Sequence, residues 1–178
     1  MFMNICDLSS SCNYVLPIYF LASIIVGLIV HVIYSKVLED MKLRTNINSL
    51  DLEGLSSLMR AAQLDNVKLV LRLINNGADV NMENEDGWTA LFFAARCGSL
   101  NVTEILLQHG ADRNHIDKHG WTALFQAARY GQTDVVEKLI LKGADLGHSD
   151  EMGVTALRLA QTYKRTSMIK LLKERGAQ

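Results

Sequence analysis

Residues 87–145 contain the same 26-residue motif twice. Residues 87–112 read GWTALFFAARCGSLNVTEILLQHGAD, and residues 120–145 read GWTALFQAARYGQTDVVEKLILKGAD. Sixteen of the 26 positions are identical, and Gly87 of the first copy corresponds to Gly120 of the second. The same register extends back to Gly54 and forward to Gly153. A fixed period of this length predicts a stack of similar units, each made of a few secondary-structure elements, that share a continuous core.

The apolar residues of each copy predict two helices. Leu91, Ala94 and Ala95 lie on one face of a first helix, and the alanines allow a neighbouring helix to approach closely. Val102 and Ile105, together with Leu106, give a second helix its apolar stripe. The equivalent residues of the next copy are Leu124, Ala127, Ala128, Val135, Leu139 and Ile140. No single unit of this size can bury its own apolar face, so the units must stack.

Glycine and threonine mark the ends of these helices. Gly98 and Gly131 follow the first helix of each copy, and Gly110 and Gly143 follow the second. Glycine adopts left-handed backbone angles at little cost, which makes it a frequent helix terminator. The first helix of each unit begins after a threonine whose hydroxyl can accept a hydrogen bond from the helix N-terminus. These threonines are Thr89, Thr122 and Thr155.

The order of these residues resembles the ankyrin repeat, a 33-residue unit of a hairpin turn and two antiparallel helices. The family's core line is D-G-x-T-P-L-H-x-A-A-x-x-G, followed by a second helix and by L-L-x-x-G-A-D-x-N. The chain has D-G-W-T-A-L-F at 86–92, A-A-R-C-G at 94–98, L-L at 106–107 and G-A-D at 110–112, with N at 114. The resemblance covers residues 54–178. It implies an all-α solenoid of four helix-turn-helix units with hairpin turns, at about 54–86, 87–119, 120–152 and 153–178.

The chain departs from the family line at two kinds of position. Phe92 and Phe125 stand where the family has a histidine that links adjacent units by hydrogen bonds. Because phenylalanine can only pack, we expect an apolar contact between units. Asp65 and Lys164 stand where the first helix of the outermost units should end in glycine. Terminal units of an array are commonly atypical because one of their faces meets solvent.

Residues 14–34, YVLPIYFLASIIVGLIVHVIY, contain no Asp, Glu, Lys or Arg. At about 1.5 Å of rise per residue, they would form a helix of roughly 30 Å, the thickness of a bilayer's hydrocarbon core. Tyr14 and Tyr34 fall at the two ends, where amphipathic rings favour the membrane interface. The segment predicts a transmembrane helix, preceded by a short tail at 1–13 and followed by a juxtamembrane helix and linker at 35–53.

Two other interpretations of this segment fit less well. A buried core helix has no place in a stack of short repeats, because an all-round apolar helix needs partners on every side. A cleaved signal peptide should open with Lys or Arg, keep its apolar core to about 7–15 residues and end in small residues. The chain has no Lys or Arg before the segment, and its apolar run is longer.

The flanking charges predict the orientation of the span. Lys36, Lys42 and Arg44 follow it, whereas Asp7 is the only charged side chain before it. Lys and Arg favour the cytoplasmic side of a membrane, so the N-terminus is expected outside and the repeat domain in the cytoplasm. The glycosylation motif at 101–103, Asn-Val-Thr, should then remain unmodified.

Composition and motif spacing argue against catalysis and nucleic-acid binding. The net charge is −1, with 18 basic and 19 acidic residues, so no basic excess favours nucleic acid. The three cysteines are too scattered for a disulfide framework or a zinc site. His115 and His119 bracket a turn, and His109 and His148 are expected to be solvated. The sequence predicts no enzyme activity, no cofactor, no metal and no small-molecule substrate.

Binding to a protein is the function that the resemblance implies. Members of the ankyrin-repeat family contact partners through the hairpin tips and the inner face of the first helix. Trp, Tyr and Arg are enriched at such positions in this chain, and they dominate binding hot spots. Trp88 and Trp121 have an alternative role, which is to cover the turn of the next unit. The candidate partner-binding residues are Glu85, Asp86, Trp88, Arg96, Cys97, Lys118, His119, Trp121, Arg129, Tyr130 and Tyr163.

These features predict a non-enzymatic, membrane-anchored adaptor or scaffold that binds a protein partner. Two alternatives remain open. The chain could be a soluble exported ankyrin-type effector whose leader is cleaved near Ser35. It could also be an accessory subunit of a membrane complex, in which Ser23 and Gly27 provide a small-xxx-small face for helix contacts within the membrane.

Overall fold

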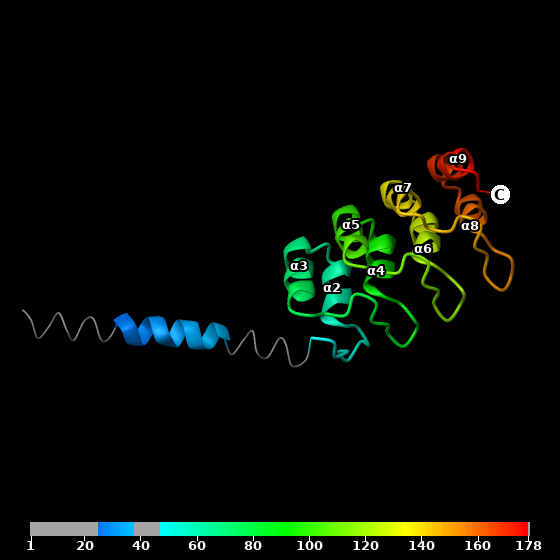
Figure 1. Ribbon diagram of the computed structural model, residues 1–178. Coiled ribbons are helices and arrows are strands. Elements are labelled where there is room, and N and C mark those ends of the chain that lie inside the picture. Colours follow the sequence, from blue (N-terminus) through cyan, green and yellow to red (C-terminus); the bar gives the residue numbers. More distant parts are fainter. Residues whose placement is uncertain (1–24, 38–46, 178) are drawn as a thin grey trace, which may run out of the picture. The chain divides into compact units, whose positions relative to one another are not determined.

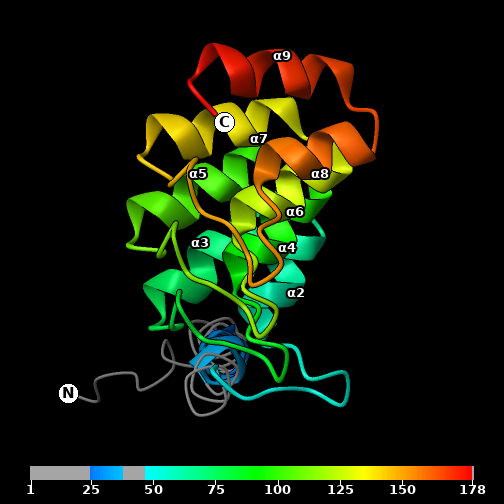
Figure 2. The same cartoon turned by 90° about the vertical axis from the view of Figure 1, so that its right-hand side faces the viewer.

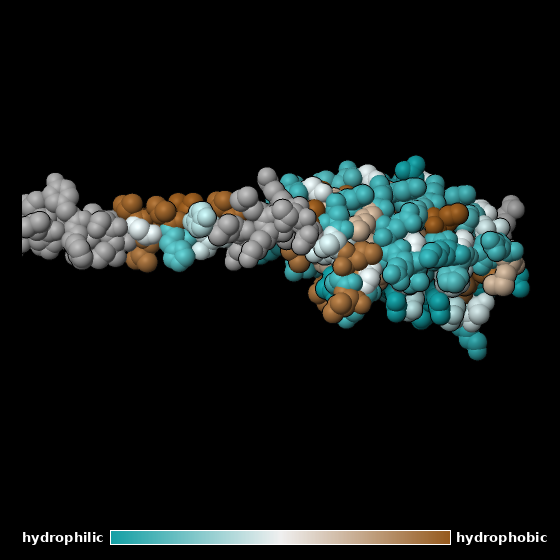
Figure 3. Space-filling model, turned by 90° about the horizontal axis from the view of Figure 1, so that it is seen from below, coloured by the Kyte–Doolittle hydropathy of each residue, from teal (hydrophilic) through white to brown (hydrophobic). Residues whose placement is uncertain are grey.

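The structure is a computed structural model that describes residues 25–37 and 47–177. The chain divides into two compact units, Met1–Thr45 and Asn46–Gln178. In the first unit, residues 25–37 form a helix in which every residue is exposed. Figure 3 shows that apolar side chains cover most of this helix.

The predicted transmembrane helix lies only partly within the described residues. Residues 25–34 of the span are helical, and residues 14–24 lie outside the described part, as do the predicted tail and residues 38–46 of the predicted linker. Over residues 25–37 and 47–177, no helix has both the length and the apolar character needed to cross a membrane.

The second unit is a two-layered stack of helices (Figure 1). The inner row consists of α2 (Ser57–Gln63), α4 (Ala90–Cys97), α6 (Ala123–Tyr130) and α8 (Ala156–Thr162). The outer row consists of α3 (Val67–Asn75), α5 (Leu100–Gln108), α7 (Thr133–Leu141) and α9 (Thr166–Glu174). Each helix packs on the next member of its own row and on its antiparallel partner in the other row. Figure 2 shows the rows stacked from α2 and α3 at one end to α8 and α9 at the other, with the hairpin loops on one side. The predicted four-unit, all-α repeat architecture is confirmed for residues 47–177.

The inner row carries the core of the stack. All six residues from Ala90 to Ala95 are buried, because α4 lies between α2, α6 and α5. Phe92 and Phe125 are 0% exposed. Both phenylalanines therefore pack in the core, as predicted. A side chain of this size contributes roughly 1.5–3 kcal/mol through burial alone.

The outer row is held by a narrower apolar stripe. Val102, Thr103 and Leu106 of α5 are buried, whereas Ile105 is only half-buried. Ile105 thus lies at the margin of the predicted stripe, and Thr103 is buried beside Val102. The same holds in α7, where Val136 is buried and the predicted Ile140 is half-buried.

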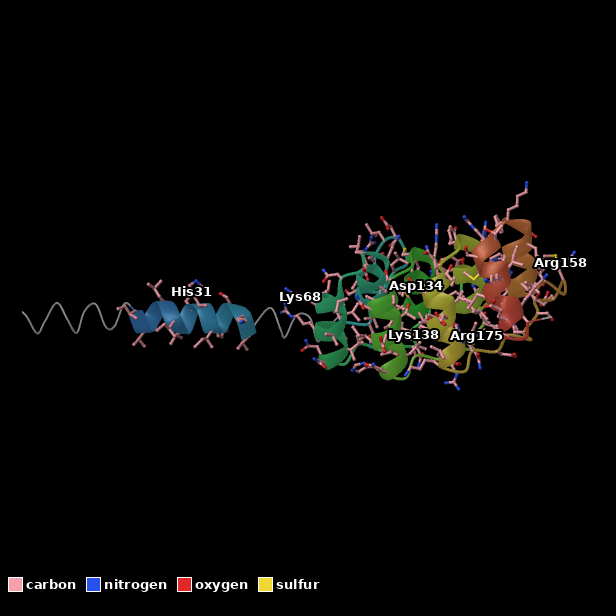
Figure 4. All side chains as sticks on the ribbon, turned by 90° about the horizontal axis from the view of Figure 1, so that it is seen from above. His31, Lys68, Asp134, Lys138, Arg158 and Arg175 are labelled. Atoms are coloured by element: carbon pink, nitrogen blue, oxygen red, sulfur yellow. The ribbon has the colours of Figure 1, made fainter. Side chains whose placement is uncertain are left out.

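Ion pairs link neighbouring outer helices at the surface. Lys138 of α7 lies 3.0 Å from a carboxylate oxygen of Glu104 in α5. Arg175, which follows α9, pairs with Glu137 of α7 at 2.5 Å. Figure 4 labels the two cations of these pairs, Lys138 and Arg175. Exposed pairs of this kind each contribute only about 0–1 kcal/mol, so apolar burial remains the main force that holds the rows together.

Most of the predicted helix ends are confirmed. Gly98 and Gly131 adopt left-handed angles, with φ of 78° and 77°. The hydroxyls of Thr122 and Thr155 accept hydrogen bonds from the helix N-termini. Thr89 occupies the equivalent position, but its hydroxyl makes no capping bond. There the carbonyl of Thr89 accepts the Phe92 amide at 3.1 Å, so a backbone bond takes the place of the predicted cap.

Asp65 and Lys164 adopt left-handed angles at the positions where the family has glycine, with φ of 52° and 54°. Left-handed angles cost non-glycine residues about 1 kcal/mol. We therefore expect Lys164→Gly to raise the free energy of unfolding by roughly 0.5–1 kcal/mol. Urea denaturation monitored by tryptophan fluorescence measures this effect, because both tryptophans lie in the stack. The matched variant Lys170→Gly, inside α9, should lower stability by about 1 kcal/mol. A gain of stability in both variants would contradict the explanation that glycine relieves the cost of the positive φ angle.

The compact unit begins at Asn46, ahead of the expected boundary at Gly54. Ile47 is 6% exposed, and the side-chain oxygen of Asn48 accepts the Asp79 amide at 2.9 Å. The same bond recurs from Asn81 to Asp112 and from Asn114 to Asp145. Residues 47–53 thus belong to the first unit, although part of this segment was predicted as linker.

The first hairpin is held by a surface ion cluster. Arg60 donates from Nε to Asp51 at 3.0 Å, and its Nη2 contacts both Asp51 and Glu53. The bond from Arg60, followed by the backbone amide of Leu55, holds the pKa of the Asp51 carboxyl below its usual value. The ion pair stabilises the fold at pH values above the usual pKa of an aspartate. This stabilisation is lost as the pH falls through the lowered pKa of Asp51.

We expect Arg60→Gln to raise the pKa of Asp51 towards the ordinary value for an aspartate. A carboxyl-carbon NMR titration of Asp51 measures this shift. The control Lys142→Gln removes one positive charge elsewhere on the surface and should leave the titration unchanged. An unchanged Asp51 titration in Arg60→Gln would show that the guanidinium does not set this pKa.

Candidate partner-binding face

The hairpin loops of the stack are shaped by one side chain in each unit. Asn84, Asp117 and Asp150 occupy the same position of successive repeats, and each accepts two backbone amides of its own loop. For Asp117 the donors are His119 and Trp121, both at 2.9 Å. Asp117 and Asp150 are buried, at 6% and 7% exposure. These carboxylates therefore fix the loops that carry the predicted binding residues.

Each tryptophan joins its own unit to the hairpin of the next. Trp88 donates from Nε1 to Asp117 Oδ2 at 2.9 Å, and Trp121 donates to Asp150 Oδ2 at 3.2 Å. Both indoles are half-buried. The tryptophans thus cover the turn of the next unit, which is the alternative role considered for them. Each indole still has ring surface open to solvent.

Two histidines link the units where the family histidine is missing. The Nε2 atoms of His115 and His148 lie 2.9 and 2.8 Å from the carbonyl oxygens of Gly87 and Gly120. Their rings lie against Phe92 and Phe125, with centroids 5.8 and 5.5 Å apart. The prediction that His148 is solvated was wrong, because the loop that follows α7 turns its ring inward against Phe125. His109 is exposed, as predicted.

Arginines and aromatic rings alternate along the inner face. The Arg96 guanidinium lies 5.7 Å from the Trp88 ring centroid and 5.2 Å from that of Tyr130. The Arg129 guanidinium lies 5.4 Å from Trp121, 5.7 Å from Tyr130 and 5.2 Å from Tyr163. Such contacts hold a guanidinium flat against an aromatic face. We call this set the arginine–aromatic ladder: Trp88, Arg96, Trp121, Arg129, Tyr130 and Tyr163.

The two ladder arginines have no carboxylate partner among the residues that the structure describes, where the ion pairs involve other cations. Arg96 is exposed and Arg129 is half-buried. A guanidinium near aromatic rings keeps its N–H donors, and a carboxylate can accept two of them at once. The ladder therefore presents fixed, unneutralised positive charge to solvent.

A groove of about 510 Å³ opens between α6 and the third and fourth hairpins. Its volume lies within the roughly 300–1,000 Å³ range that is usual for ligand sites. The groove is lined by Trp88, Asp117, Lys118, His119, Trp121, Gln126, Arg129, Asp150, Glu151 and Met152. Met152 is 80% exposed at its edge.

Gln126 is the unusual residue of this groove. It is 2% exposed, and in the part of the chain that the structure describes its side-chain amide has no hydrogen-bond partner. The same helical position holds Phe93 in α4 and Leu159 in α8, each 6% exposed. Among the described residues, Thr103 Oγ1 is the one fully buried side-chain polar atom without a hydrogen-bond partner. The amide atoms of Gln126 therefore keep contact with the groove, where the neighbouring units place apolar side chains.

Comparison with known proteins agrees with this geometry. A family model described as ankyrin repeats (3 copies) matches residues 32–117, 58–150 and 112–178. The chain belongs to the ankyrin-repeat family. No curated protein is similar enough to be matched to this ankyrin-repeat chain.

The ankyrin-repeat stack brings together most of the predicted partner-binding residues. Trp88, Lys118, His119, Trp121 and Arg129 line the groove. Arg96, Tyr130 and Tyr163 join Arg129 in the ladder.

Three predicted residues lie apart from both the groove and the ladder. Glu85 and Asp86 are exposed in the second hairpin, where the Asp86 carbonyl accepts the Lys118 amide at 3.2 Å. Cys97 is an exposed free thiol. Within residues 25–37 and 47–177, no cluster of His, Cys, Asp or Glu could hold a metal ion.

Sequence reasoning missed Asp117, Gln126 and Asp150. The two aspartates could have been found from the 33-residue register, which aligns them with Asn84 three positions before each hairpin glycine. Gln126 could have been noticed as the polar residue that replaces Phe93 in the duplicated motif. That the amide has no partner could be learned only from the packing around it.

Proposed function

We propose that this ankyrin-repeat protein is a non-enzymatic, membrane-anchored adaptor that binds a protein partner through the ladder and the groove. The observation that carries the proposal is the pair of arginines held on aromatic rings without a carboxylate partner in the described stack. Arg, Trp and Tyr are the residues that most often dominate binding energy at protein interfaces. Here they occur together and are held in fixed positions.

The membrane part of the proposal rests on residues 14–34, which have no charged side chain. The helical part, residues 25–37, exposes apolar side chains such as Val32 at 65% and Val37 at 47%. An exposed apolar surface of this kind is stabilised when lipid or another protein covers it. We propose that the lipid bilayer does so, with the N-terminus outside and the ankyrin repeats in the cytoplasm.

Affinity capture with the full-length protein in detergent tests partner binding. The variant Arg96→Gln/Arg129→Gln should recover at least tenfold less partner than the wild type, because truncating an arginine at a binding hot spot commonly costs about 2 kcal/mol. The control Lys142→Gln/Lys170→Gln removes the same charge from exposed positions of the outer row. Equal recovery by both variants would refute the proposed face.

Alkaline carbonate extraction and thiol labelling test the anchor. The protein should stay in the membrane pellet after carbonate treatment; its release would refute the span. In a Cys6→Ser/Cys12→Ser variant, the exposed Cys97 should react with a membrane-impermeant maleimide only after the cells are permeabilised. The motif at 101–103 is a poor topology reporter, because Thr103 is 0% exposed inside α5.

A further inference from the structure

We infer that the groove binds an extended acidic segment of the partner, with Gln126 bonding to a main-chain peptide group and Arg129 to a carboxylate. The inference rests on the proposed function, which says only that this face binds a protein. It adds that the bound part of the partner is an extended segment with acidic side chains.

The amide of Gln126 matches the polar groups of a peptide main chain. It offers one carbonyl acceptor and two N–H donors, and a peptide group offers one donor and one acceptor. Gln126 lines the groove at 2% exposure with no partner in the described residues. A peptide group laid in the groove would offer the amide one donor and one acceptor, whereas an apolar ligand would leave it unpaired.

The other buried polar groups of the groove are already occupied. Each of Asp117 and Asp150 accepts two backbone amides at Oδ1 and one indole at Oδ2. The indole N–H donors of Trp88 and Trp121 are used in those bonds, so their open surface in the groove is apolar. Ring surfaces beside an amide with no hydrogen bond in the described stack suit an extended chain, whose side chains contact the rings while its main chain is hydrogen-bonded.

The charge of the segment follows from the arginines. Arg129 lines the groove, and Arg96 continues the ladder beside it; the guanidinium groups of Arg96 and Arg129 lie 5.2 Å and 5.7 Å from the Tyr130 ring centroid. Lys118 adds a positive charge at the hairpin, and Asp117, Asp150 and Glu151 line the same groove, so the attraction for an acidic side chain is local to the arginines. Two acidic side chains of one segment can therefore meet two fixed guanidinium groups, each in a bidentate pair.

A carboxylate fits the groove better than a phosphate. Asp117, Asp150 and Glu151 also line it, and their repulsion acts about twice as strongly on a dianion as on a monoanion. Glu151 is exposed, so water weakens its effect on a singly charged ligand. We therefore place Asp or Glu, and not phosphoserine, against Arg129.

Selection from a display library of random peptides, with the full-length protein in nanodiscs, tests the inference. The selected peptides should be enriched in Asp and Glu. A fluorescein-labelled peptide from this pool should bind at least tenfold more weakly to Arg129→Gln, and about tenfold more weakly to Gln126→Leu. The controls Lys142→Gln and Gln161→Leu, at exposed positions, should bind like the wild type.

Backbone methylation separates main-chain recognition from a general packing effect. Among peptides carrying one N-methyl group each, one position should weaken binding to the wild type about tenfold and cause no further loss in Gln126→Leu. Additive losses at every position would overturn the role of Gln126. Enrichment of basic or uncharged peptides, or tighter binding by phosphoserine versions, would overturn the acidic segment.

The failure of this inference can be told from the failure of the proposed function. If no linear peptide is selected but a folded partner is captured in an arginine-dependent way, the face binds protein and the extended segment is wrong. If neither peptide binding nor partner capture depends on Arg96 or Arg129, both statements fail.

Discussion

Phe125→Ala lowers the free energy of unfolding by about 3–5 kcal/mol, the usual cost of removing a fully buried aromatic side chain. Phe125 is 0% exposed, and its ring contacts Trp121 and His148. The loss is not confined to one unit, because the cavity opens where α6 meets the hairpin of the next unit. Urea denaturation of the detergent-solubilised protein, followed by tryptophan fluorescence, measures it.

The control for this experiment is Leu141→Ala, which removes an exposed apolar side chain from the end of α7. It should change stability by no more than about 0.5 kcal/mol. A similar small loss in Phe125→Ala would show that the apolar contact between units is not what holds the stack together.

We expect Gln126→Leu to raise the free energy of unfolding by about 0.5–1 kcal/mol, because an apolar side chain replaces an amide that is 2% exposed and makes no hydrogen bond within the described stack. The substitution is compatible with the fold, since Leu159 occupies the same helical position in α8. The same change weakens binding in the groove. The two effects together are the pattern of a functional side chain retained at a cost in stability.

Gln161→Leu is the matched control, because Gln161 is exposed at the end of α8. It should leave stability within about 0.5 kcal/mol of the wild type. A loss of stability in Gln126→Leu would mean that ordered water already satisfies the amide, and the case for a peptide group at this position would then be withdrawn.

The repeat architecture could be predicted from the sequence because its determinants are local and recur. Gly98 and Gly131 follow the first helix in both copies, and both adopt the left-handed angles expected of them. Asp65 and Lys164 stand at the equivalent position of the terminal units. They keep the positive φ angle although they are not glycine. These features depend on the position of a residue in the repeat period.

The parts that could not be predicted depend on contacts between units. His148 was assigned to solvent because its loop position carries no information about the Phe125 ring it meets. The hydroxyl of Thr89 looked like a cap, since nothing in the motif distinguishes it from Thr122. The arginine–aromatic ladder joins residues of successive units, so its alternation appears only when the helices are stacked.

The tryptophan and asparagine bonds described above recur at a fixed spacing, and this has a consequence for how the protein can change in length. Trp88 reaches Asp117 and Trp121 reaches Asp150, each 29 residues ahead, while the Asn81 and Asn114 side chains reach 31 residues ahead. A third copy of residues 87–119, inserted in frame between the two existing ones, would find its donors and acceptors already in place on both sides. Duplication of one whole period could therefore lengthen the array and its binding face in a single genetic event. An insertion that is not a whole number of periods would break two rows of bonds at once.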